Sequence, residues 1–146
     1  MRLIALMMVA AWGLSGCIGT PSPKAEVIGV DVSDVSDDGT AVVVRVSVTN
    51  EGEVELPLPK ADYTVTVEGA EPFSLVMVPD TVAPMGEGSL SVIELPAAFA
   101  GGDLTGRAWR VSGTLTYEPP GDLRRLATDY RVPLPFTLFS GEGVLE

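Results

Sequence analysis

The stretch Ala41-Val42-Val43-Val44-Arg45-Val46-Ser47-Val48-Thr49-Asn50 decides the fold class. Val42, Val44, Val46 and Val48 share one parity of this stretch, which Asn50 ends. The other parity carries the polar residues Arg45, Ser47 and Thr49. Successive side chains of a β-strand point to opposite faces, so a period of two predicts a strand with one buried face and one hydrated face.

The same alternation predicts further strands on both sides of this one. On a strand before it, the expected core residues are Ile28, Val30 and Val32, and on a strand after it they are Tyr63, Val65 and Val67. Residues 73–78 and 90–95 supply two more strands. A strand over residues 109–117 is expected to bury Trp109, Val111, Leu115 and Tyr117, with Gly113 at a bulge or a close approach.

The last predicted strand is the most apolar one. Its expected core residues share one parity and are Tyr130, Val132, Leu134, Phe136 and Leu138. Phe139 has the opposite parity, and it is expected to contact a partner or to cap the end of the fold. Aromatic side chains bury large areas, so Tyr63, Trp109, Tyr117 and Tyr130 are assigned to the core rather than to a ligand groove.

Turn residues separate the predicted strands. Asp37-Asp38-Gly39 is typical of a hairpin, and Pro84-Met85-Gly86 and Pro119-Pro120-Gly121 interrupt later strands. A short helix is expected at residues 96–100, which begin with proline and precede two glycines. About seven short strands with at most one short helix predict an all-β, antiparallel β-sandwich of immunoglobulin or fibronectin type III architecture, formed by residues 26–146.

The N-terminus has the features of a secretory signal. Met1-Arg2 precedes the apolar run Leu3–Trp12, which is too short to span a bilayer comfortably. The four residues that follow, Leu14, Ser15, Gly16 and Cys17, resemble the bacterial lipobox. Residues 1–16 are therefore interpreted as a lipoprotein signal peptide and residues 17–25 as a flexible tether. The alternative is an ordinary signal peptide or membrane anchor.

The lipobox resemblance implies that Cys17 becomes the first residue of the mature protein and carries a diacylglycerol thioether and an N-acyl chain. The membrane is then the expected partner, together with possible envelope proteins, and the expected location is the cell envelope. Ile18 stands where many Gram-negative lipoproteins of the inner membrane carry aspartate. By analogy, a Gram-negative source implies the outer membrane, facing the periplasm.

Composition restricts the chemistry. Cys17 is the only cysteine and there is no histidine, so an internal disulfide, a thiolate metal cluster and triads that need histidine are excluded. We therefore expect a protein that is not an enzyme and holds no cofactor beyond the lipid on Cys17. The net charge of −11 disfavours nucleic acid as a partner. Four dispersed cations, Lys60, Arg124, Arg125 and Arg131, are too few for a nucleic-acid stripe.

Two acidic groups were weighed as candidate sites. Asp31, Asp34, Asp37 and Asp38 lie within eight positions and are weak calcium candidates without the EF-hand order. The alternative is a solvated strand end followed by an Asp-Gly turn. Glu51, Glu53 and Glu55 alternate and are interpreted as charges that protect a strand edge from pairing with another chain.

Several stretches, read in order, resemble the late embryogenesis abundant (LEA) group 2 domain, also called the WHy (water stress and hypersensitive response) domain. The resemblance covers residues 26–145 and is carried by Val46–Asn50, Leu56–Pro59, Asp62–Gly69, Val82–Gly86, Trp109–Tyr117 and Pro133–Gly141. The chain departs from the family where Asn50 is followed by Glu51-Gly52 instead of proline.

The LEA resemblance implies a fibronectin-like sandwich and an association with desiccation and stress protection, without catalytic residues. The leading hypothesis is a membrane-tethered lipoprotein that protects components of the cell envelope by contact under desiccation or osmotic stress. The alternative is an envelope binding or assembly module that holds a peptide, a lipid or a partner lipoprotein at a sheet edge or loop tip.

Overall fold

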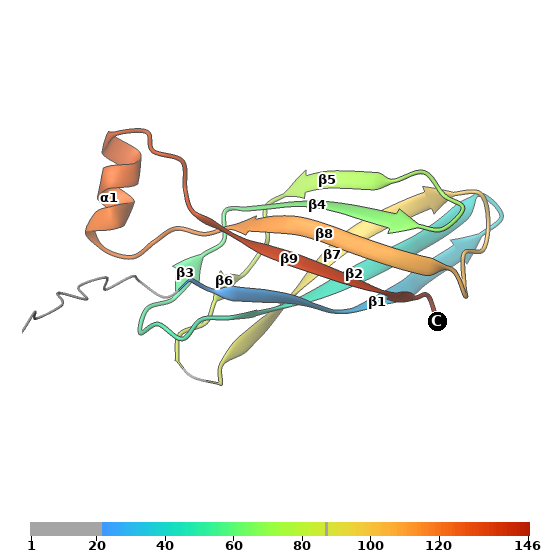
Figure 1. Cartoon of the computed structure of the whole chain (residues 1–146), viewed down its shortest axis with the longest axis horizontal. Coiled ribbons are helices and arrows are strands. Elements are labelled where there is room, and N and C mark those ends of the chain that lie inside the picture. The colour runs from blue at the N-terminus through green and yellow to red at the C-terminus, as the bar shows by residue number, and fades with distance from the viewer. Residues whose placement is uncertain (1–21, 87) are drawn as a thin grey trace, which may run out of the picture.

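Two antiparallel sheets face each other in the computed structural model, which describes residues 22–86 and 88–146 (Figure 1). One sheet has the order β1-β2-β7, formed by β1 (Lys24–Ser36), β2 (Gly39–Thr49) and β7 (Leu90–Ala100). The other has the order β5-β4-β8-β9, formed by β4 (Lys60–Val67), β5 (Phe73–Met77), β8 (Ala108–Thr116) and β9 (Phe136–Val144). The predicted all-β antiparallel sandwich is confirmed.

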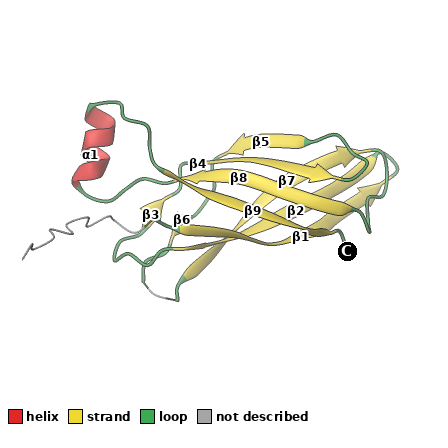
Figure 2. Ribbon diagram, viewed as in Figure 1, coloured by secondary structure: helices red, strands yellow, loops and turns green. Residues whose placement is uncertain are grey.

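Three short elements complete the described chain. The strands β3 (Leu56–Pro57) and β6 (Val82–Ala83) pair with each other near one end of the sandwich. The helix α1 (Asp122–Asp129) lies beyond the same end, apart from both sheets (Figure 2). The predicted fold class allowed one short helix, but not at this place.

The core lies between the two sheets and follows the predicted parity on the central strands. Four of the five valines of β2, namely Val42, Val44, Val46 and Val48, are at most 1% exposed. Val65, on β4 of the facing sheet, is 0% exposed, and Trp109 and Leu115 of β8 are also buried. Each such side chain contributes roughly 1.5–3 kcal/mol when it leaves water, so these strands supply much of the driving force for folding.

The first strand departs from the predicted parity. Ile28 was expected in the core but is 53% exposed. The register of β1 against β2 shifts between Val27 and Gly29, and again between Val32 and Asp34. Each shift inserts an extra residue, which moves the following side chains to the opposite face. Ala25 and Val30 are therefore both buried although their parities differ.

The hairpin between β1 and β2 matches its prediction. Ser36 pairs with Gly39, which leaves Asp37 and Asp38 as the turn. Gly39 lies against the backbone of β7, since a Cβ atom there would be 3.1 Å from the carbonyl carbon of Phe99. At the other end of β1, the strand begins at Lys24, two residues before the predicted start of the folded domain.

The short helix expected at residues 96–100 is wrong. The chain continues there as β7, with Ala97 opposite Val42 and Phe99 opposite Thr40 of β2. Ala97 and Phe99 are buried, whereas the residues between them are exposed, which is the period of a strand. Pairing along the whole length of β2 outweighs the local helix preference of the alanines.

The last predicted strand is wrong in its start and in its buried face. Residues 122–129 form α1, and β9 begins only at Phe136. Tyr130, Val132, Phe136 and Leu138, all expected in the core, are 74%, 55%, 59% and 69% exposed. Phe139 is buried instead, at 4% exposure.

Gly113 explains why Phe139 faces inward. The two residues pair across β8 and β9. A Cβ atom on Gly113 would lie 2.9 Å from Cε2 of Phe139 and 2.6 Å from the carbonyl oxygen of Asp62. The ring therefore occupies the space that a side chain would need, and the close approach predicted at Gly113 is confirmed. The register there is regular, without a bulge.

Candidate functional site

The predicted lipidation site lies outside the described residues. Leu14, Ser15, Gly16 and Cys17 all precede Ser22, the first residue that the structure describes. Within residues 22–86 and 88–146 there is no helix of the length and hydropathy that a membrane crossing requires.

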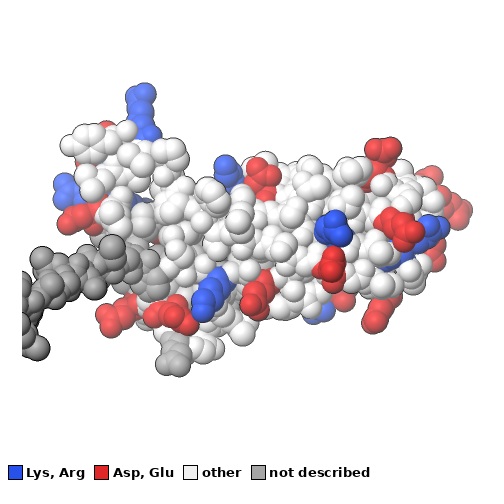
Figure 3. All heavy atoms as spheres, in the orientation of Figure 1, with Lys and Arg blue, Asp and Glu red and all other residues white. Residues whose placement is uncertain are grey.

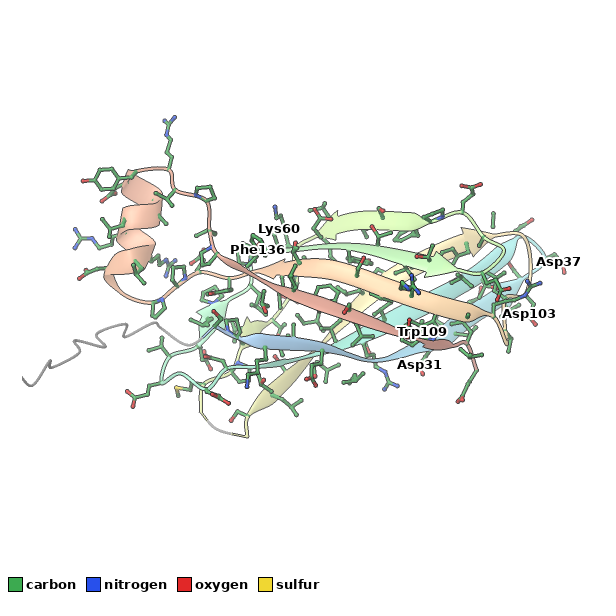
Figure 4. All side chains as sticks on the ribbon, in the orientation of Figure 1. Asp31, Asp37, Lys60, Asp103, Trp109 and Phe136 are labelled. Carbon is green, nitrogen blue, oxygen red and sulfur yellow. The ribbon has the colours of Figure 1, made fainter. Side chains whose placement is uncertain are left out.

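The calcium candidates do not converge. Asp31 forms an ion pair with Arg45 of the neighbouring strand, with 2.7 Å between Oδ2 and Nη2. Asp37 and Asp38 form the turn at the tip of the hairpin, well away from Asp31 (Figure 4). The described residues contain no cluster of three or more acidic side chains suited to a metal ion. The solvated strand end and turn therefore account for these aspartates.

Glu51, Glu53 and Glu55 are exposed, but they lie in the loop between β2 and β3 rather than on a strand edge. The loop is organised by Asn50, which is only 2% exposed. Its Nδ2 donates to the carbonyl oxygen of Val54 at 2.7 Å, and its Oδ1 accepts from the backbone N–H of Gly52 at 3.0 Å.

In the sequence, Asn50 stands out only as the position where the chain departs from the family pattern. An Asn whose side chain accepts from the backbone two residues on is an Asx-turn, and the glycine at position 52 was the available signal. A Cβ at Gly52 would approach Oδ1 of Asn50 to 3.0 Å.

A row of hydroxyl side chains crosses the outer face of the four-stranded sheet. Ser74 pairs with Thr64, Thr64 with Ser112, and Ser112 with Ser140, so each strand contributes one hydroxyl. The hydroxyl oxygens of Thr64 and Ser74 are 2.8 Å apart. We call these four residues the hydroxyl row.

The hydroxyl row borders a shallow depression of about 630 Å³ on the same face. The next row of paired residues across the sheet consists of Val76, Asp62, Thr114 and Leu138. Hydroxyl groups donate and accept hydrogen bonds, so this face can bind water or other small polar groups in several orientations.

Charge is distributed unevenly over the molecule. Acidic side chains are most numerous at the end of the sandwich opposite α1, but others lie at the α1 end, and the middle of the face seen in Figure 3 carries side chains of both charges. Residues 122–131 depart from this acidity because they carry three arginines, Arg124, Arg125 and Arg131, against Asp122 and Asp129. This segment has a net charge of +1 in a chain of net charge −11.

The segment between β8 and β9 forms an apolar cleft of about 450 Å³, which we call the α1 cleft. It is lined by Tyr117, Pro119, Leu123, Leu126, Ala127, Val132, Pro133 and Pro135. No residue of α1 is buried, and Leu123 and Leu126 are 51% and 48% exposed. The helix therefore presents its apolar face without a partner among the described residues.

The α1 cleft is joined to the body of the sandwich at its base. The backbone N–H of Glu118 donates to the carbonyl oxygen of Pro57 at 2.9 Å, and that of Tyr117 donates to Pro135 at 3.1 Å. Arg124 and Glu118 form an ion pair at 2.9 Å. Lys60 and Phe136 belong to one row of paired residues across β4, β8 and β9, and this row adjoins the base of the cleft. Both residues lie at the same end of the sandwich as this base (Figure 4).

Tyr63 links the two sheets through its hydroxyl group, which donates to the carbonyl oxygen of Pro96. Its side chain is 1% exposed, and burial raises the pKa of the phenol to about 12. The phenol therefore stays protonated at neutral pH and acts as a hydrogen-bond donor within the core. At the acidic end, Asp103 accepts from the hydroxyl and the N–H of Thr105, which lowers the pKa of its carboxyl group.

These features define an all-β sandwich with a hydroxyl-bearing sheet face and a basic helical extension at one end. No family model matches the sequence, and no curated protein sequence matches it. Five solved chains match the fold, among them two solution structures with TM-scores above 0.5. The solution structure of a candidate late embryogenesis abundant (LEA) protein, At2g46140.1, has a TM-score of 0.63 and 20% identity, covering 84% of this chain and 70% of that one.

The second match is the solution structure of AT1g01470 from Arabidopsis thaliana. It has a TM-score of 0.55 and 17% identity, and the match covers 97% of this chain and 94% of that one. The chain therefore has a LEA-like fold, and the resemblance to the LEA group 2 or WHy domain is confirmed at the level of the fold.

Proposed function

We propose that this protein is a non-catalytic, lipid-anchored LEA group 2-like protein that protects components of the cell envelope during desiccation or osmotic stress. The single observation that supports protection best is the hydroxyl row on a sheet face of a LEA-like fold. A folded protein can protect only through its surface, because its core side chains are already in contact with one another. Disordered polar chains, by contrast, can fold around a client as water is lost.

The surface suits this role in two ways. Hydroxyl groups replace water as donors and acceptors when the hydration layer is lost, and they do so without strong orientation demands. Because like charges repel, the excess negative charge keeps copies of the protein from associating with one another. Other molecules that have these copies between them are kept from associating as well.

The experiment dries a labile reporter enzyme with increasing amounts of residues 17–146, which retain every described element. An unrelated acidic β-sandwich is the control. We expect protection in proportion to the amount of protein, without turnover and beyond that of the control. Equal protection by the two proteins would contradict a role for the LEA-like surface.

A matched pair of variants tests the hydroxyl row itself. Thr64→Val with Ser112→Ala removes the two central hydroxyls, whereas Ser33→Ala with Ser47→Ala removes two hydroxyls from the other sheet. We expect the first pair to protect less than the second at equal melting temperature. Identical protection by both pairs would remove the hydroxyl row from the proposal.

The anchor part of the proposal rests on the lipobox resemblance at Leu14–Cys17. Replacing Cys17 with serine removes the sulfur to which the diacylglycerol is attached. We expect the wild-type protein to incorporate labelled fatty acid and the Cys17→Ser protein to incorporate none. A Cys17→Ser protein that is still acylated would contradict the anchor. With Ile18 after the cysteine, a Gram-negative source implies the outer membrane, which fractionation of that membrane checks.

The second candidate function, a binding or assembly module, is favoured by one observation. β5 is an end strand of its sheet, and Val76 on it and Val78 just beyond it are 57% and 73% exposed. An extended peptide can add to such an edge through backbone hydrogen bonds. A stoichiometric envelope partner, captured by the wild-type protein and lost with Val76→Pro, would favour this function over general protection.

A further inference from the structure

We propose that the α1 cleft docks onto the phospholipid bilayer that holds the lipid of Cys17, and so orients the sandwich with its acidic end away from the membrane. This inference rests on the proposed lipidation of Cys17. The apolar face of α1 consists of Leu123, Leu126, Ala127 and Tyr130, whose spacing of three and four residues places them on one side of a helix. The occupant must be apolar, because this face and the prolines opposite it line the cleft.

The position of the described N-terminus makes the bilayer the occupant. The hydroxyl of Tyr117, a residue of the cleft, donates to Oγ of Ser22 at 3.1 Å. Five peptide units separate Ser22 from Cys17, and a fully extended chain of that length spans at most about 17 Å. A bilayer that holds the acyl chains of Cys17 is therefore within about 17 Å of the cleft.

Charge supports the same occupant. Residues 122–131 carry a net charge of +1. Arg125 and Arg131 lie beside the apolar face, and Arg124 forms an ion pair with Glu118. Helices that lie in a membrane interface combine an apolar face with arginines or lysines that reach anionic headgroups. Tyr130, at 74% exposure, has the amphipathic ring that is enriched at this interface.

α1 alone is too short to bind a membrane firmly, and the anchor supplies what it lacks. Once Cys17 is held in the bilayer, contact by the helix becomes an intramolecular step at high effective concentration. The helix then determines how the protein is oriented on the membrane, and the lipid determines how long the protein stays there. This places the hydroxyl row, which crosses the strands of the sandwich body, at the side of a molecule standing on the membrane.

The test uses the lipidated full chain, expressed in a bacterial host and reconstituted into phosphatidylethanolamine and phosphatidylglycerol vesicles. Acylation occupies the only native thiol, so an introduced cysteine takes a polarity-sensitive fluorophore at one position. Leu126→Cys reports on the α1 cleft, Tyr130→Cys reports on the residue that directly follows α1, and Asp37→Cys at the opposite end is the matched control. Vesicles are prepared with and without nitroxide-labelled phospholipids, and acylation of Cys17 is measured by mass in every sample.

We expect a blue-shifted emission at positions 126 and 130, with quenching by nitroxide lipids several-fold greater than at position 37. A blue shift without quenching would mean that the cleft holds a second copy, a peptide or the protein's own acyl chain away from the bilayer, and would overturn the proposal. Emission at all three positions typical of water would overturn it as well. Acylated samples with such results refute only the docking, whereas absence of acyl groups on Cys17 refutes the anchor.

Discussion

The hydroxyl of Tyr63 on β4 donates a hydrogen bond to the backbone carbonyl of Pro96 on β7, and so joins the two sheets through the core. β7 is an end strand, and proline, which has no N–H to donate, is tolerated in such strands. Through this bond, the facing sheet supplies a hydrogen-bond donor to the end strand β7. It thereby helps to hold β7 in the strand geometry that replaced the expected short helix.

Removing this hydroxyl in Tyr63→Phe should lower the free energy of unfolding by about 1 kcal/mol, the net value of one hydrogen bond. Volume and burial are preserved, so the fold should be retained. Chemical denaturation followed by tryptophan fluorescence measures the change. A Tyr63→Phe protein as stable as wild type would show that the bond between the sheets contributes nothing.

The raised pKa of Tyr63 predicts a loss of stability at alkaline pH. The phenol has a pKa of about 12 in the folded protein against 10.0 for an unperturbed tyrosine, so the folded state holds the proton more tightly. Its contribution is complete below pH 10 and is lost as pH rises toward 12, with a slope of up to about 1.4 kcal/mol per pH unit. The free energy of unfolding, measured by denaturation at several pH values in this range, should fall more steeply with pH in wild type than in Tyr63→Phe. Equal dependence on pH in the two proteins would contradict the assignment.

The inward face of β2 predicts a sharp contrast between neighbouring positions. Val44 is 0% exposed, and Val44→Asp should unfold the domain, because an unpaired buried carboxylate costs several kcal/mol of a total of about 5–15 kcal/mol. Arg45→Gln removes only the exposed ion pair with Asp31 and should cost about 0–1 kcal/mol. Circular dichroism melting of the two variants makes the comparison, and equal melting temperatures would refute the strand register.

Arg45→Asp would be a poorer control than Arg45→Gln. It would place a second carboxylate beside Asp31, which now pairs with Arg45 at 2.7 Å. Like charges across adjacent strands destabilise a sheet, and this adds a cost unrelated to burial.

The close approach at Gly113 predicts that Gly113→Ala destabilises the protein by about 1–3 kcal/mol, the usual cost of overpacking. The new methyl group would be 2.6 Å from the backbone oxygen of Asp62 and would displace the ring of Phe139. Gly29→Ala is the control, because the nearest atom there is Nη2 of Arg45 at 3.8 Å. Thermal melting should place Gly113→Ala well below Gly29→Ala, and the reverse order would contradict the packing described for β8 and β9.

The candidate surfaces could be foreseen only in part. The sequence marked Tyr63, Trp109 and Tyr117 as core residues, and all three are buried. It could not assemble the hydroxyl row, because Thr64, Ser74, Ser112 and Ser140 are neighbours only through the register of three strand pairs. The α1 cleft was missed as well, since Val132 was assigned to a strand by parity and Leu123 and Leu126 were assigned to no element.

The sequence by itself determined the strands whose two faces differ in polarity, such as β2 and β4, and the Asp37-Asp38 turn. Alternation and turn chemistry are local, and burial of one face rewards the same geometry that the pattern encodes. Tertiary structure alone decided the bulges of β1, the continuation of β7 through Pro96 and the inward turn of Phe139. Those outcomes depend on which backbone lies opposite. The length of β2, the space left by Gly113 and the extra residue at Ile28 each act on a pair of strands. No single stretch of sequence contains both strands of such a pair.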